Sequence, residues 1–260
     1  MVSKPQRILL SYIQVRGPAL EATYDAIKRN ARCSFDQLRE LFCMPEKNTS
    51  SLQTGQLRGC LNFLRTVNLV KVESVSGEET FGIVDDLQSI PFHAILLHKL
   101  RLTKDASFYE VQKVLARNDI SLINLNQLRR LVEDSLDLGF AWTPVKLNFW
   151  MELADFLCLG TKMSSRNFIF YPSPELIYTI LESFAENHGQ IRLNKFVEYL
   201  RSNFFECLTK EGHFRLFQGL QQTLLLLEKH ERVEFISMSD DPRLVKVGDK
   251  SVSLVSVKGG

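Results

Sequence analysis

Six basic residues of this chain have types and positions that suit the binding of anionic or hydrogen-bonding ligands. A guanidinium presents a planar fork of N–H donors that matches phosphate oxygens and the edge of guanine, whereas an ammonium binds phosphate as a compact charge. The alternative is that these residues are ordinary solvated charges, because acidic residues are interspersed among them. The candidate nucleic-acid-binding residues are Arg58, Arg65, Arg129, Arg130, Lys47 and Lys71.

Catalytic patterns are missing from the sequence. It contains no Walker A loop, no GxGxxG following a strand, no GxSxG and no HExxH. Acidic residues gather at 133–137 and at Asp240 and Asp241, but the first group suits a solvated helix face and the second suits a turn. We therefore expect a non-enzymatic protein that uses no cofactor.

Metal-ligand spacing is also absent. His93 and His98 are five residues apart, which directs them to different faces of a helix, and no two cysteines have the two-residue separation of a zinc site. Cys207 and His213 come closest, yet a core thiol and a partly exposed imidazole explain them better. We predict no metal site.

Composition narrows the class of protein further. The chain has 260 residues, of which 45% are hydrophobic, and its net charge is only +2, from 32 Lys and Arg against 30 Asp and Glu. Such a balance provides no overall basic field, so any binding of nucleic acid must rely on local patches. The five unevenly spaced cysteines favour reduced thiols. With no membrane-spanning stretch, an intracellular protein is expected, cytoplasmic or in the nucleus or nucleoid.

The elements that must position these residues are clearest near the carboxyl end. Ser173, Pro174 and Glu175 start a helix, and a second short helix carries Phe196 and Leu200. A third amphipathic helix is predicted over 214–229. The hydrophobic period then falls to two over 233–247, with a turn in between, which predicts a β-hairpin.

The amino-terminal third has the same order. Helices are predicted around Leu20 to Ile27, from a capping box at Ser34 and Gln37, and over about 52–67, followed by a hairpin over 69–84.

The middle third is less regular. Helices are expected over 91–102, after a capping box at Ser107, and after Asn124, where the third helix carries Arg129 and Arg130. A further helix starting at Thr143-Pro144 reads as an insertion, and 167–171 as a strand.

This order of helix, helix, helix and hairpin resembles the winged helix-turn-helix superfamily, and the resemblance rests on pattern alone. It implies a mainly α fold with small β-hairpins (α+β), built as tandem winged helices at 1–90, 91–172 and 173–260. The middle region is an elaborated winged helix or a helical domain. In this superfamily the third helix can enter the major groove while the wing lies on the backbone.

Two functions follow from the resemblance. The first is a DNA-binding protein, acting on double-stranded DNA in transcription regulation or in genome maintenance or defence. The second is a non-catalytic scaffold subunit whose winged helices bind protein partners in a larger assembly. The arginines of the first two regions favour DNA. The third region favours proteins, because its third helix carries little positive charge and Asp240 and Asp241 would repel phosphate. Its run of leucines over 224–227 suits an ordinary core.

Overall fold

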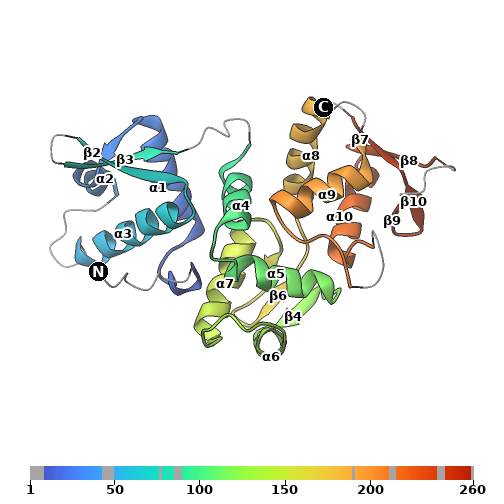
Figure 1. Cartoon of the computed structure of the whole chain (residues 1–260), viewed down its shortest axis with the longest axis horizontal. Coiled ribbons are helices and arrows are strands. Elements are labelled where there is room, and N and C mark those ends of the chain that lie inside the picture. Colours follow the sequence, from blue (N-terminus) through green and yellow to red (C-terminus); the bar gives the residue numbers. More distant parts are fainter. Residues whose placement is uncertain are drawn as a thin grey trace.

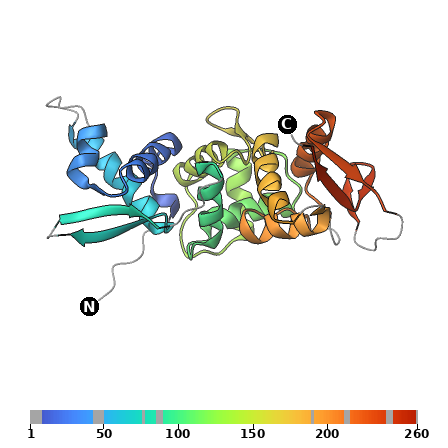
Figure 2. The same cartoon turned by 90° about the horizontal axis from the view of Figure 1, so that it is seen from above.

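The fold, taken from a computed structural model, is a mixed α+β arrangement in which helices predominate and the sheets are small and antiparallel. The structure describes residues 9–42, 50–75, 78–84, 90–188, 191–210, 215–238 and 244–258. Three units follow one another along the long axis of the molecule (Figure 1), and the same succession is seen from above (Figure 2). No helix in the described ranges is long and apolar enough to cross a bilayer.

The first unit follows a short 3-10 helix, η1 (Leu9–Ser11). Its elements in chain order are α1 (Gly17–Arg29), β1 (Cys33–Ser34), α2 (Phe35–Phe42), α3 (Ser50–Thr66), β2 (Val70–Val75) and β3 (Glu78–Ile83). The strands form a sheet in the order β1-β3-β2, in which Phe81 of the central strand lies opposite both Cys33 and Val72. The predicted hairpin over 69–84 is therefore confirmed, as is the capping box of Ser34 and Gln37.

The middle unit has the same order of elements, preceded by an extra helix, α4 (Phe92–Leu102). Its elements are α5 (Ser107–Arg117), β4 (Leu122–Asn124), α6 (Leu125–Ser135), α7 (Pro144–Phe156), β5 (Thr161–Lys162) and β6 (Asn167–Ile169). The sheet order is β4-β6-β5, and Phe168 of the central strand lies opposite Ile123 and Lys162. The helix that precedes the last two strands is thus α7, so our interpretation of α7 as an insertion is wrong.

The third unit repeats the order with one addition. It contains α8 (Pro174–His188), β7 (Ile191–Arg192), α9 (Leu193–Asn203), α10 (Gln218–Lys229), β8 (Val233–Ile236), β9 (Val245–Val247), β10 (Lys250–Val252) and β11 (Leu254–Val257). The three-stranded sheet has the order β7-β11-β8, and Val255 lies opposite Ile191 and Phe235. Strands β9 and β10 pair with each other as a separate hairpin.

Two predictions for this unit need correction. Strand β8 pairs with β11 and not with β9, because β9 and β10 form an inserted hairpin and β11 follows it. The third helix begins at Gln218 and not at Phe214, since Arg215 and Leu216 instead make isolated bridges to Lys246 and Leu208. Phe214 and the predicted turn residues Asp240 and Asp241 lie outside the described residues.

The helix ends repeat a backbone motif. After α3, α5, α7 and α10 one residue takes a positive φ of 54 to 58°, and these residues are Asn68, Asp119, Cys158 and Glu231. The next residue donates its N–H five positions back, as Leu69 does to Leu64, which closes a Schellman cap. Each cap stops a helix and turns the chain directly into a strand. At α5, by contrast, the predicted capping box is wrong, because the carboxylate of Asp105 and not the side chain of Ser107 accepts an N–H there.

One continuous hydrophobic core runs from Leu9 to Val255 through all three units. Helix α4 connects them: the ring of Phe92 lies 4.9 Å from that of Tyr24 and 6.3 Å from that of Phe156, while His98 is 2.9 Å from the backbone oxygen of Asn203 in α9. The three units therefore pack on one another. The boundaries at 90 and 172 stay predictions, since the core crosses them.

Candidate nucleic-acid interface

Helix α3 presents an outward stripe of polar residues that contains no acid. Arg58, Asn62 and Arg65 are exposed, and their spacing of four and three residues places them on one face of the helix. Leu57, Leu61 and Leu64, each about 100° around the helix from a stripe residue, are buried, as are Cys60 and Phe63 on the opposite face. None of the 17 residues of α3 is Asp or Glu. The stripe therefore offers N–H donors to a ligand without a competing carboxylate on its own helix.

The two arginines of the stripe are held in place without being neutralised. The guanidinium of Arg58 lies over the ring of Phe35 at the start of α2, 5.0 Å from the ring centroid. Such a contact orients the plane and leaves its N–H edges free to donate. Arg65 lies in the last turn of α3, where the helix dipole favours a cation. Neither side chain forms an ion pair with another described residue.

Of the two predicted lysines the structure describes only Lys71, whose charge is already paired. The ammonium of Lys71 on β2 is 2.8 Å from Glu73 Oε1, and Arg32 is 3.1 Å from the other oxygen of the same carboxylate. The hydrogen bond from Lys71, followed by the charges of Arg32 and Lys71, lowers the pKa of Glu73, which stays ionised. Lys71 is thus already paired on the hairpin. Lys47 lies outside the described residues.

Arg129 and Arg130 occupy a different helix from the one expected. They lie on α6, which by strand pairing is the second helix of its unit and corresponds to α2, whereas α7 corresponds to α3. Both are exposed, and Arg129 Nε is 2.8 Å from Glu133 Oε1. The prediction counted α4 as the first helix of the middle unit, because its sequence pattern is that of such a helix, and so it took α6 for the third helix. The structure therefore separates these arginines from any third helix.

The helices that correspond to α3 in the other units are largely interior. In α7 the indole of Trp150 is fully buried and donates its N–H to the backbone oxygen of Phe108. In α10 Leu224 and Leu227 are buried, and the hydroxyl of Thr223 donates to the backbone oxygen of Pro172. The interpretation of the leucine run as core is confirmed for these two residues. Among the described third helices, α3 carries two exposed arginines without an ion pair, whereas α10 carries one such cation, Lys229.

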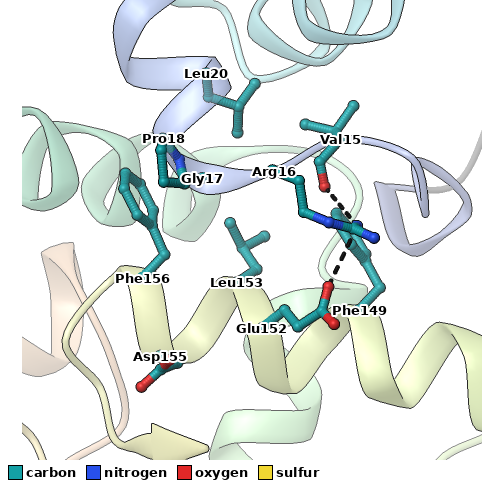
Figure 3. Close-up of a pocket in the computed structure, with 10 residues that line it drawn as sticks. All are labelled: Val15, Arg16, Gly17, Pro18, Leu20, Phe149, Glu152, Leu153, Asp155 and Phe156. Atoms are coloured by element: carbon teal, nitrogen blue, oxygen red, sulfur yellow. Dashed lines mark hydrogen bonds and ion pairs between the residues drawn. The ribbon is translucent and has the colours of Figure 1, made fainter. Parts of the chain in front are cut away.

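A hollow of about 360 Å³ marks the junction between the first and middle units. Figure 3 shows Arg16 at its edge, above Glu152 of α7, with the ring of Phe156 against the start of α1. Arg16 Nη1 is 3.2 Å from Glu152 Oε2, and Lys162 Nζ is 2.9 Å from Oε1. A Cβ on Gly17 would lie 2.0 Å from the ring of Phe156, so the close approach of the two units requires glycine there.

The carboxylate of Glu152 is structural and not poised for proton transfer. Burial alone would raise its pKa, but the hydrogen bond and charge of Lys162, the charge of Arg16 and a hydrogen bond from Asn148 together lower it. A general acid or base needs a pKa near the working pH, and this group moves away from it. No group of three potential metal ligands occurs among the described residues, and His213 lies outside them.

Sequence reasoning found Arg58 and Arg65 but overlooked Asn62 between them. The sequence did contain a sign of this surface: the 17-residue helix has no acidic residue, although a quarter of the residues in the chain are charged. The exposure of the stripe could not be inferred from the pattern alone, since α7 and α10 also have polar positions. No protein-family model matches the chain, and the comparison with curated proteins finds no similar sequence.

Proposed function

We propose that this chain is a tandem winged-helix protein that binds double-stranded DNA through α3 of its first unit. The succession of helix, strand, helix, helix and two strands, with the last strand central in the sheet, supports the winged-helix assignment of each unit. The outward stripe of Arg58, Asn62 and Arg65 is the observation that carries the proposal. Its role would be in transcription regulation or in genome maintenance or defence.

The side chains of the stripe suit the major groove. An arginine can bind the O6 and N7 atoms of guanine with two hydrogen bonds, and an asparagine can bind the N6 and N7 atoms of adenine in the same way. Arg58 and Arg65 are two turns apart, about 10 Å along the axis, which fits within one face of the groove. The stripe can thus read a short run of bases.

The hairpin of the first unit limits the strength of this binding. Lys71 shares Glu73 with Arg32, and Glu79 is exposed on the next strand. These carboxylates reduce the attraction of the wing for backbone phosphate. We therefore expect few phosphate contacts and a modest salt dependence, with a slope of log K against log salt of roughly −2 to −3, since each neutralised phosphate contributes about −0.9.

The first test is binding itself. The full chain is titrated into a fluorescently labelled pool of random duplexes, and anisotropy is followed at about 50 and about 150 mM salt. Binding that weakens with this small slope supports the proposal. Absence of binding at the lower salt concentration would remove DNA as the ligand.

Binding of protein partners is the second candidate function, and it could coexist with the first. Leu41 and Phe42, at the end of α2, expose 62% and 39% of their surface, which is unusual for adjacent large apolar residues. They lie beside α1, away from the stripe of α3. This surface is the one that a scaffold subunit would offer.

A further inference from the structure

A groove runs between α1, α2 and α3 of the first unit. It consists of two adjoining hollows of about 280 and 490 Å³, which share Ala22 and Phe42. The smaller reaches the buried side chains of Leu57 and Cys60 on α3, and the larger extends along α1 beyond Leu41. The groove is thus a channel of mixed polarity with two adjoining depressions, and Leu41 and Phe42 form an exposed apolar wall on one side of it.

The length of the groove fits a helix. Along α1 its lining extends from Pro18 to Arg29, a span of eleven residue steps, or about 17 Å at 1.5 Å per step. That distance corresponds to about three turns of a partner helix. The floor on α1 is formed by Ala19, Ala22 and Ala26, whose small side chains allow another helix to approach closely. Two depressions would accept two large apolar side chains one turn apart.

The rim of the groove is acidic. Glu21 and Asp25 lie one turn apart on α1 and both line the larger hollow. Among the described residues that line the groove, Arg29 is the only cation; its guanidinium is 3.9 Å from Asp25, and because the two side chains are 80% and 42% exposed, the pair is weak. The described residues of the rim thus keep a net negative charge, which favours a ligand with basic residues at the same spacing.

We infer that this groove binds an amphipathic helix of a protein partner, with large apolar residues on one face and Lys or Arg along its border. Leu41 and Phe42 form the wall against which the apolar face packs. Glu21 and Asp25 pair with the basic border. This inference goes beyond DNA binding, and each can hold without the other.

The groove and the DNA-binding stripe occupy different sides of α3. Gln56 and Cys60, which line the groove, are directed roughly 160 to 200° away from Arg58 around the helix axis, at 100° per residue. A partner in the groove would leave the stripe open. Substitutions in the groove should therefore leave DNA affinity unchanged, which separates failure of this inference from failure of the proposed function.

The experiment is a selection from a phage-displayed library of helical peptides against the full chain, with counter-selection against the Leu41→Asp variant. Leu122→Asp is the matched control, because Leu122 on β4 is 65% exposed against 62% for Leu41. Enriched peptides should carry large apolar residues at i and i+3 or i+4 and Lys or Arg beside them. Their affinity should fall about tenfold or more in Leu41→Asp and stay within about twofold in Leu122→Asp.

A charge reversal sharpens the test. In the Glu21→Lys, Asp25→Lys double variant the same library should yield peptides with Asp or Glu on the border. Three results would overturn the inference. The first is that no peptide distinguishes Leu41→Asp from Leu122→Asp. The others are that the native chain and the double variant select peptides with the same border residues, or that the native chain selects peptides with acidic borders. A lower melting temperature of Leu41→Asp with unchanged peptide binding would assign the groove to the chain's own packing, and would overturn it as well.

Discussion

The carboxylate of Glu152 links the first and middle units, because it binds a cation from each of them. It accepts hydrogen bonds from Lys162 and Asn148 in its own unit and pairs with Arg16 of the segment leading into α1. Its side chain is 29% exposed, so solvent screens these contacts only in part. Removal of its charge leaves Arg16 and Lys162 close to each other without an anion between them.

The Glu152→Gln variant should be less stable than the native chain by about 1 kcal/mol at neutral pH. Because the folded-state pKa lies below the ordinary value of 4.5, the ionised carboxylate stabilises the fold fully above that value and loses its effect as pH falls through the folded pKa. Urea unfolding of both proteins at neutral pH and at about pH 3 measures the difference. A difference that persists or grows in acid would contradict this role.

At the residue scale, sequence reasoning recognised charges but not their partners. The pairing of Lys71 with Glu73 could be predicted from their two-residue spacing along one strand. The second partner of Glu73, Arg32, could not, because it lies in a loop about 40 positions away. Arg58 was selected for its charge, whereas its contact with Phe35 depends on how α2 and α3 pack. Such long-range contacts leave no periodic trace in the sequence.

At the scale of elements, local signals were reliable and distant pairings were not. The helix starts at Asn124 and at Thr143 were both predicted and are both present, because each cap involves neighbours in sequence; Asn124 also forms a capping box with Gln127. The pairing of β8 with β11 was missed, since an intervening hairpin separates them. Likewise, α4 has a strong helical pattern, but only the sheet order shows that it lies outside the repeated unit.

The Schellman cap of α10 yields a stability prediction. Glu231 has a φ of 56°, which costs an L-residue about 1 kcal/mol or more, and its side chain is exposed. The Glu231→Gly variant should therefore be more stable by up to about 1 kcal/mol, after the greater backbone entropy of glycine is allowed for. Thermal unfolding measures this gain. Glu231→Ala keeps the Cβ and should show no gain; an equal gain in both variants would mean that the backbone is not the cause.

At the scale of the whole molecule, the middle and third units are joined by a buried carboxylate. Glu206 is 1% exposed and lies between two arginines: Arg201 Nε is 2.9 Å from Oε1 and Arg117 Nε is 3.5 Å from Oε2. The side chain of Gln112 on α5 also forms two hydrogen bonds with the backbone of Glu206. These contacts attach the segment after α9 to the middle unit.

The Glu206→Gln variant should lose roughly 2 to 4 kcal/mol of unfolding free energy, because the buried site loses the anion that both arginines face. Chemical denaturation followed by far-ultraviolet circular dichroism measures the loss. Glu198→Gln is the control, since Glu198 forms an exposed pair with Lys195 that contributes little. Similar losses from both variants would show that the attachment of the third unit does not depend on Glu206.

The central claim is that α3, and not α6, meets DNA, and paired arginine variants test it most directly. Anisotropy titrations with a labelled duplex at about 50 and about 150 mM salt compare the native chain, Arg58→Ala with Arg65→Ala, and Arg129→Ala with Arg130→Ala. The first pair should lower affinity at least about tenfold, since each lost base contact costs about 1 to 3 kcal/mol, while the second should change it less than about threefold. Equal losses from the two pairs, or none from the first, would contradict the account.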